Sequence, residues 1–188
     1  MKKYLRFLPV VTFVGVSLLF LFLTPGKIVA YIGIENAYVL IFVLAFLGGL
    51  TTFSGIPYHL VLIGFAAGGL NPWILGPLTA IAVSLGDCTS YLIGYFGREI
   101  IPVRLQNAMQ RLSRIQEAHP RLLPSVFFLY GALVPFSNDV ITIPMGFLKY
   151  PILRVMIPLA IGTTIFNTGL ALVAVYAYDW IPFVQLNN

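Results

Sequence analysis

Residues 57–97 read PYHLVLIGFAAGGLNPWILGPLTAIAVSLGDCTSYLIGYFG, and residues 135–178 read PFSNDVITIPMGFLKYPILRVMIPLAIGTTIFNTGLALVAVYAY. Each stretch is a short apolar segment that begins with a proline, followed by a turn and then a long apolar segment. Three pairs of glycines or prolines occupy matching places, namely Pro57 with Pro135, Gly68 with Gly146, and Pro77 with Pro158. Transporters commonly build a site near the middle of the membrane from two such broken segments. The pattern therefore predicts two related halves around one site.

The composition predicts an integral membrane protein. Of the 188 residues, 59% are hydrophobic and only 9% are charged, whereas soluble domains carry about 25% charged residues. The net charge of +5 comes from basic residues at the ends of apolar runs, which indicates contact with a membrane surface and not with nucleic acid. The single cysteine, Cys88, lies in an apolar run, so no disulfide framework is expected within the chain.

The apolar runs predict an all-α membrane domain that spans residues 1–188. Its expected segments are a transmembrane helix at 8–24, a re-entrant hairpin at 37–70, a transmembrane helix at 74–97, an interfacial amphipathic helix at 98–121, a second re-entrant hairpin at 122–150 and a transmembrane helix at 152–178. The run at 8–24 lacks a small-x-small cleavage site and is expected to stay as a span. The two arms around the break at 51–57 are short for a crossing, which favours a hairpin over two ordinary spans with a tight loop.

Small residues predict where helices approach closely. Within 74–97 they recur at every fourth position, as Ala82, Gly86, Ser90 and Gly94. Such a face lets another helix pack at short distance. In the second half, Thr163, Asn167 and Ala171 fall at the equivalent positions, and Gly68 and Gly146 are expected to allow close packing of the hairpins.

The central segment predicts both a lipid surface and an orientation. It contains five arginines, namely Arg98, Arg104, Arg111, Arg114 and Arg121. Of these, Arg104, Arg111 and Arg114 share one face of an expected amphipathic helix that ends near His119-Pro120. Basic segments lie on the cytoplasmic side, which places this helix and the N-terminus there. The first hairpin then enters from outside and the second from the cytoplasm, so the two repeats are inverted.

Polar residues inside apolar segments are the candidates for chemistry, because burying them in a bilayer is costly. Asp139 follows Ser137 and Asn138 in the second break, where it either exchanges protons or holds a cation, or else caps the next helix. Asp87 is a protonatable partner of Asp139, or a structural group bonded to Thr89, Ser90 or a neighbouring helix. His59, next to Pro57 in the first break, titrates near neutral pH or is a satisfied interior residue.

The sequence contains no hydrolase triad, zinc-ligand spacing, P-loop or dinucleotide fingerprint. We therefore expect no enzymatic activity, no metal site and no cofactor.

Residues 86–98, GDCTSYLIGYFGR, resemble the G-D-x-x-x-Y-x-x-G-x-x-G-R segment of the DedA family, also called the VTT or SNARE-associated Golgi protein superfamily. The spacing from Pro135 to Gly146 is also similar to that family. The resemblance implies two opposed re-entrant hairpins and transport of phospholipids or polyprenyl phosphates, in some members with proton dependence. Ala132 and Asn138 stand where many bacterial members carry arginines. The acidic residue of the first hairpin in those members has no clear counterpart in this chain, where His59 lies only near the corresponding position.

The expected function is therefore movement of lipids, as a flippase or scramblase, with protons as a further partner. The expected pathway residues are Asp139, Asn138, Ser137, Asp87 and His59. The alternatives are a proton- or cation-coupled exporter of small cationic solutes and a scaffold that transports nothing. The expected location is a prokaryotic plasma membrane with a cytoplasmic N-terminus, and a homo-oligomer is left open.

Overall fold

A computed structural model describes residues 11, 14–18, 23–50, 56–97, 103–118 and 121–178. The regular secondary structure of these residues consists of helices and includes no strand, which confirms the all-α class. The labelled helices are α2 (Pro25–Ile32), α3 (Ile34–Leu50), α4 (Tyr58–Ala67), α5 (Pro72–Phe96), α6 (Val103–Ala118), α7 (Leu123–Leu133), α8 (Asp139–Phe147) and α9 (Ile152–Tyr178). Most of the span expected at 8–24 and the centre of the first break lie outside the described residues.

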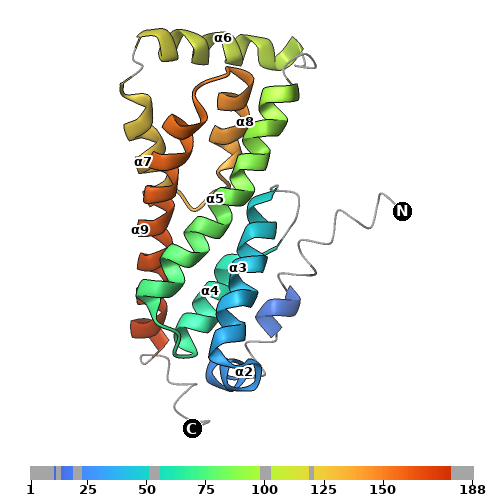
Figure 1. The fold of residues 1–188 in the computed structure, drawn as a ribbon, viewed down its shortest axis with the longest axis vertical. Coiled ribbons are helices and arrows are strands. Elements are labelled where there is room, and N and C mark those ends of the chain that lie inside the picture. Colours follow the sequence, from blue (N-terminus) through green and yellow to red (C-terminus); the bar gives the residue numbers. More distant parts are fainter. Residues whose placement is uncertain are drawn as a thin grey trace, which may run out of the picture.

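Two long helices, α5 and α9, pack against each other and run along most of the molecule (Figure 1). Helix α5 begins cleanly because the Asn71 side chain accepts a hydrogen bond from the Trp73 N–H at 2.9 Å and Pro72 occupies the first turn. Helix α3 packs on α5 and α7 packs on α9. The short helices pack the other way round, with α8 on α5 and α4 on α9. Each half of the chain is thus built into the other.

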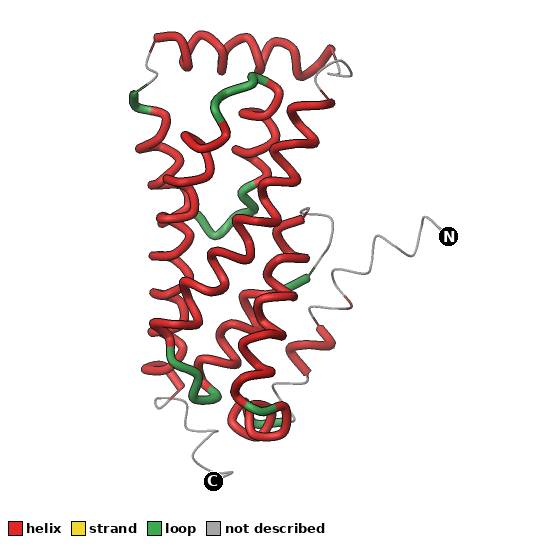
Figure 2. Tube along the Cα trace, in the orientation of Figure 1, coloured by secondary structure: helices red, strands yellow, loops and turns green. Residues whose placement is uncertain are grey.

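Two breaks interrupt the helix pairs near the middle of the molecule. Helix α3 ends at Leu50 and α4 begins at Tyr58, while α7 ends at Leu133 and α8 begins at Asp139. Figure 2 shows the loop between α7 and α8 at mid-length, with the described end of the first break at a similar level. The pair α7–α8 is joined at this loop and extends toward the end covered by α6, whereas α3–α4 extends toward the end where α2 lies (Figure 1).

The turns that follow α4 and α8 have the same hydrogen bonds. Leu70 N–H donates to Phe65 C=O at 3.1 Å, and Tyr150 N–H donates to Met145 C=O at 3.0 Å. The residue before each donor is left-handed, with φ of 100° at Gly69 and 53° at Lys149. These bonds make residues 64–70 the counterpart of residues 144–150.

This register corrects the sequence comparison of the two halves. The residue opposite Gly68 is Leu148, and Gly146 lies opposite Ala66. The same shift along α5 and α9 carries Asp87 onto Asn167, which the sequence comparison had placed opposite Gly86.

Glycines lie where the helices come closest. A Cβ on Gly94 would meet the carbonyl oxygen of Ile143, and a Cβ on Gly146 would meet that of Tyr91, so α5 and α8 touch backbone to backbone. A Cβ on Gly68 would lie 2.8 Å from the carbonyl oxygen of Pro25 in α2. Gly86 occupies a similar place against α3.

The outer surface of the long helices is apolar. Ile157, Ile161 and Ile165 are exposed along one side of α9. Residues Ile152–Ala177 are long and apolar enough to cross a bilayer, and among the described helices the pair α2–α3 also qualifies when taken together. That pair bends by 103° at Gly33, where φ is 88°. An apolar outer surface is what a bilayer requires of a protein embedded in it.

Two elements differ from their expected bounds. Helix α2 was not anticipated, and α3 begins at Ile34 and not at Ala37. The described central helix covers Val103–Ala118, within the expected range of 98–121. Its Leu112 packs against the helical core, while Ile115 is exposed.

Candidate functional site

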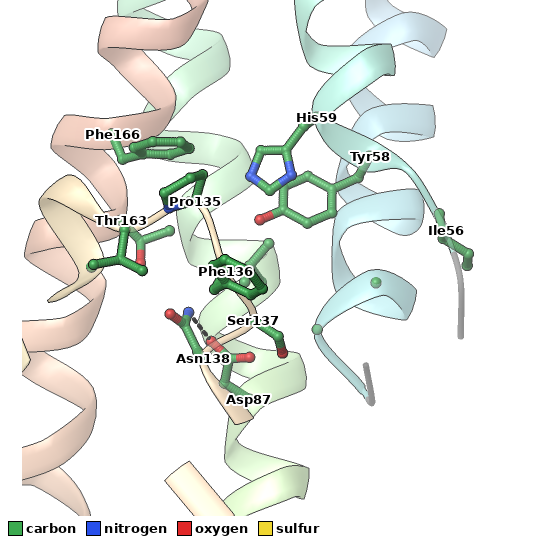
Figure 3. A pocket seen from close by; sticks show the side chains of 15 residues that line it. Ile56, Tyr58, His59, Asp87, Pro135, Phe136, Ser137, Asn138, Thr163 and Phe166 are labelled. Carbon is green, nitrogen blue, oxygen red and sulfur yellow. Dashed lines mark hydrogen bonds between the residues drawn. The ribbon is translucent and has the colours of Figure 1, made fainter. Parts of the chain in front are cut away.

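A cavity of about 210 Å³ lies between the two breaks. Both breaks and the three helices α3, α5 and α9 contribute to its wall (Figure 3). The lining residues that carry polar or aromatic side chains are Tyr58, His59, Asp87, Phe136, Ser137, Asn138, Thr163 and Phe166. The structure thus brings Asp87, His59, Ser137 and Asn138, which come from distant parts of the sequence, to one place.

The shortest polar contact in the cavity joins α5 to the second break. Asn138 Nδ2 donates a hydrogen bond to Asp87 Oδ2 at 2.6 Å. Asp87 is only 2% exposed and Asn138 is also buried. A hydrogen bond to a carboxylate is stronger than one between neutral groups, and a buried carboxylate without a partner is costly. The contact therefore fixes the second break against the middle of α5.

Asn138 stands at the N-cap of α8 but does not cap it with its side chain. Instead, Ser137 Oγ accepts a hydrogen bond from the Asp139 N–H at 3.2 Å, and the Tyr130 hydroxyl donates to the Ser137 carbonyl at 2.9 Å. The Asn138 amide is thereby left to Asp87. For Asp87, the partner is this neighbouring segment and not Thr89 or Ser90.

Asp139 is the first residue of α8 and is 8% exposed. It does not line the cavity, although its neighbour Asn138 does. A carboxylate in the first turn of a helix interacts favourably with the positive end of the helix dipole. Asp139 thus lies beside the cavity, at the start of the helix that packs on α5.

His59 forms part of the opposite wall. Its ring lies 3.9 Å from the Tyr58 ring, centroid to centroid, and 5.8 Å from that of Phe166 in an edge-on arrangement. Figure 3 shows the imidazole and the Tyr58 ring beside each other, facing Phe166 across the cavity. His59 therefore connects α4 to α9.

The same turn of α5 that carries Asp87 also holds the first break. Thr89 Oγ1 and Ser90 Oγ donate to the Leu50 carbonyl at 3.1 and 3.2 Å. Leu50 ends α3, so this carbonyl has no acceptor role inside its own helix. Residues 87–90 are thus bonded to both breaks, a role for Thr89 and Ser90 that the sequence did not reveal.

Buried polar groups on α9 were also missed. Asn167 is 0% exposed, and neither atom of its amide has a hydrogen-bond partner among the described residues. The hydroxyls of Thr163 on α9 and of Thr142 on α8 also have no partner among the described residues. Buried amides in proteins are nearly always bonded, so Asn167 calls for an explanation. The signal in the sequence was an asparagine within an apolar run.

The charges near the site are of one sign. Asp87 is the acidic residue of the cavity wall, and the wall contains no lysine or arginine. Within the described part of the chain, no group of three His, Cys, Asp or Glu residues could hold a metal ion. Arg111 and Arg114 are exposed on α6 at one end of the molecule. Arg98 lies outside the described residues, as does the side chain of Arg104.

The VTT domain family model matches residues 56–177, from the first break to the end of α9. The chain belongs to the VTT-domain family. This family, which includes the DedA and SNARE-associated Golgi proteins, makes the chain a membrane protein. Searches of curated proteins and of solved structures found no match. The VTT domain contains Asp87, Asn138 and His59, and thus most of the cavity wall.

Proposed function

We propose that this VTT-domain protein moves lipids across its membrane as a flippase or scramblase. The observation that carries the proposal is a cavity with polar walls at mid-length of a molecule whose outer surface is apolar. In this proposal the pairs α3–α4 and α7–α8 are re-entrant hairpins that form an inverted repeat. Family membership supports a transporter-like role for the domain.

The rim of the cavity supports access from the lipid. Phe136, in the second break, is 75% exposed although it lines the cavity, and Pro135 beside it is also exposed. An exposed aromatic ring at this depth suits contact with acyl chains. In the proposed mechanism, the polar headgroup enters the cavity while the chains stay in the bilayer.

The side chains of the cavity then take the following roles. Asp87 and Asn138 bind the headgroup, and His59 faces them from the start of α4. Ser137 stabilises the second break through its hydrogen bonds. Asp139, at the first residue of α8 beside the cavity, adds a second acidic group to the pathway. Enzymatic chemistry is not part of this proposal.

The test is movement of fluorescent phospholipid and of polyprenyl phosphate in proteoliposomes. We expect movement with the wild type, and its loss in Asp139→Asn and Asp87→Asn variants that still elute as folded protein. Cys88→Ala, a change at a position outside the cavity wall, is the control and should transport normally. Normal transport by both aspartate variants would reject the proposed pathway. No movement of either lipid with the wild type would reject lipid transport and leave the solute exporter or a scaffold.

A second candidate is a proton- or cation-coupled exporter of small cationic solutes. The observation in its favour is that the cavity wall carries Asp87 but no lysine or arginine, since phosphate groups are usually bound by such cations. This candidate predicts export of a cationic dye driven by a pH gradient, with no movement of either lipid. Lipid movement without dye export would exclude it.

A further inference from the structure

The helices α5 and α9 are counterparts in the two halves of the chain, but their buried polar side chains differ in hydrogen bonding. The register set by the two turns carries Asp87 onto Asn167, and it carries Tyr58 in the first break onto Asn138 in the second. Asp87 is bonded to the second break through Asn138. Asn167 is fully buried, and its amide has no hydrogen-bond partner in the part of the chain that the structure describes. The hydrogen bond between α5 and the second break is therefore formed, whereas the equivalent bond from Asn167 of α9 to Tyr58 is not.

The open connection lies between helices that already pack together. Helix α4 packs on α9, and His59 at its start already contacts Phe166, the neighbour of Asn167. Tyr58 lines the cavity, and Figure 3 shows its hydroxyl within it. A tyrosine hydroxyl can both donate to and accept from an amide. Tyr58, the first residue of α4 and the counterpart of Asn138, is thus a group that can bond Asn167.

We propose that Asp87 and Asn167 are two alternating anchors, one for each break. In the conformation described here, Asn138 is bonded to Asp87 and Tyr58 is not bonded to Asn167. In the alternate conformation, Tyr58 bonds Asn167 and the Asp87–Asn138 bond is broken. During the exchange, the part of the cavity wall contributed by one half of the chain moves first, and the part contributed by the other half moves next. Such alternation is expected of an inverted repeat.

The two conformations have compensating costs. The described conformation satisfies Asp87 but leaves a buried amide on α9 unsatisfied, and the alternate conformation reverses this. Because an unpaired carboxylate costs more than an unpaired amide, the described conformation is favoured until a ligand takes the place of Asn138 at Asp87 and shifts the populations. The headgroup or solute that binds Asp87 would favour the alternate state by displacing Asn138. This last step rests on the proposed function, whereas the exchange of anchors does not.

Spin-label distances in liposomes test the exchange without any transport assay. Labels at Val140→Cys on α8 and Ile81→Cys on α5 report the second break, and labels at Leu47→Cys on α3 and Ile161→Cys on α9 report the first. All four positions are exposed, and the background is Cys88→Ala. We expect two distance populations for each pair in the otherwise unchanged protein.

Variants then shift these populations in opposite directions. Asn167→Leu removes the second anchor and should leave one population, with the second break held on α5. Asn138→Ala removes the first anchor and should enrich the other population at least threefold. Tyr58→Phe should resemble Asn167→Leu, because it removes only the hydroxyl. Thr164→Val is the matched control on α9, since its hydroxyl bonds within its own helix, to Ala160 O at 2.8 Å.

The outcomes separate this inference from the proposed function. Distances in Asn167→Leu and Tyr58→Phe that equal those of the control variant would overturn the exchange of anchors, whatever is transported. If Asn167→Leu unfolds, Tyr58→Phe still decides, since it keeps the ring and its packing. Population shifts as described, in a protein that moves no lipid and no dye, would keep the exchange and reject the proposed function.

Discussion

At the scale of single residues, the contact that organises the site is one hydrogen bond to a buried carboxylate. Asp87 lies in the middle of α5 and Asn138 lies at the start of α8. The two side chains are bonded to each other, and both are buried. Hydrogen bonds to charged groups contribute roughly 1.5–3 kcal/mol to stability, and removing one partner leaves the other unsatisfied. The effects of replacing Asp87 and of replacing Asn138 on the free energy of unfolding should therefore be strongly coupled.

A double-mutant cycle measures that coupling. Asn138→Ala should lower the free energy of unfolding in detergent by about 1–3 kcal/mol, because it leaves the Asp87 carboxylate without its amide donor. The same change in an Asp87→Leu background should cost clearly less. Equal costs in both backgrounds would mean that the bond contributes nothing to stability.

Much of the site could be predicted from polar residues in apolar segments. Asp87, His59, Ser137 and Asn138 were expected in one pathway and line one cavity. The pairing of Asn138 with Asp87 could not be predicted, because it depends on where α8 crosses α5. Asn167 was interpreted as one of a row of packing residues, since its partner in the other half was taken to be Gly86. The repeat register could be corrected only with the backbone turns.

At the scale of the helix, backbone contacts at glycines determine how the segments cross. A Cβ on Gly162 of α9 would meet the carbonyl oxygen of Phe128 in α7, whereas a Cβ on Gly169 of the same helix meets nothing within 4 Å. Alanine substitutions at these two positions therefore distinguish the steric cost of an added Cβ from the gain in helix propensity that alanine brings.

We predict that Gly162→Ala lowers the free energy of unfolding by about 1–3 kcal/mol, as expected for overpacking. Gly169→Ala should be neutral or stabilise α9 by up to about 1 kcal/mol. Thermal unfolding of both variants in the same detergent is the measurement. Equal effects at the two positions would show that α7 does not depend on this close approach.

The end of α3 gives a second prediction for an element. Replacing Thr89 by Val and Ser90 by Ala together removes both side-chain donors to the Leu50 carbonyl. We expect the double variant to lose about 1–3 kcal/mol of stability, because the partly buried Leu50 carbonyl loses both donors and the Gly86 carbonyl loses its 2.7 Å bond from Thr89. Each single variant should lose less, since the other donor remains. Chemical unfolding of the three proteins tests this, and additive single effects would argue against a shared acceptor.

The elements differed in how well the sequence predicted them. Helix α9 covers the residues expected for the last apolar segment, because a long apolar run has no competing interpretation. Helix α2 was missed although Pro25 stands in its first turn, a common start signal. Its short length and the sharp bend at Gly33 gave no periodic pattern to recognise.

At the scale of the whole molecule, the two helix pairs extend toward opposite ends, with α6 across one end and α2 at the other (Figure 1). The basic residues of α6 place its end in the cytoplasm by the positive-inside rule. This orientation is a prediction, as is the prokaryotic plasma membrane.

Cysteine labelling from each side of the membrane tests the orientation. In a Cys88→Ala background, Arg114→Cys on α6 should react with an impermeant maleimide only from the cytoplasmic side. Tyr31→Cys on α2 should react only from the opposite side, because Tyr31 is exposed near the other end of the molecule. Reaction of both positions from one side would contradict the inverted arrangement.

The flat position of α6 across one end has a mechanical consequence. Helix α5 has 25 residues, which corresponds to roughly 37 Å, against roughly 30 Å for the hydrocarbon core of a bilayer. At the other end, Tyr31 and Trp73 are exposed, where aromatic rings favour the headgroup layer. A rod held between an interfacial helix and an aromatic belt must tilt or strain when the bilayer changes thickness. A change in the acyl-chain length of the host membrane is therefore expected to change the tilt of α5, the helix that is bonded to both breaks.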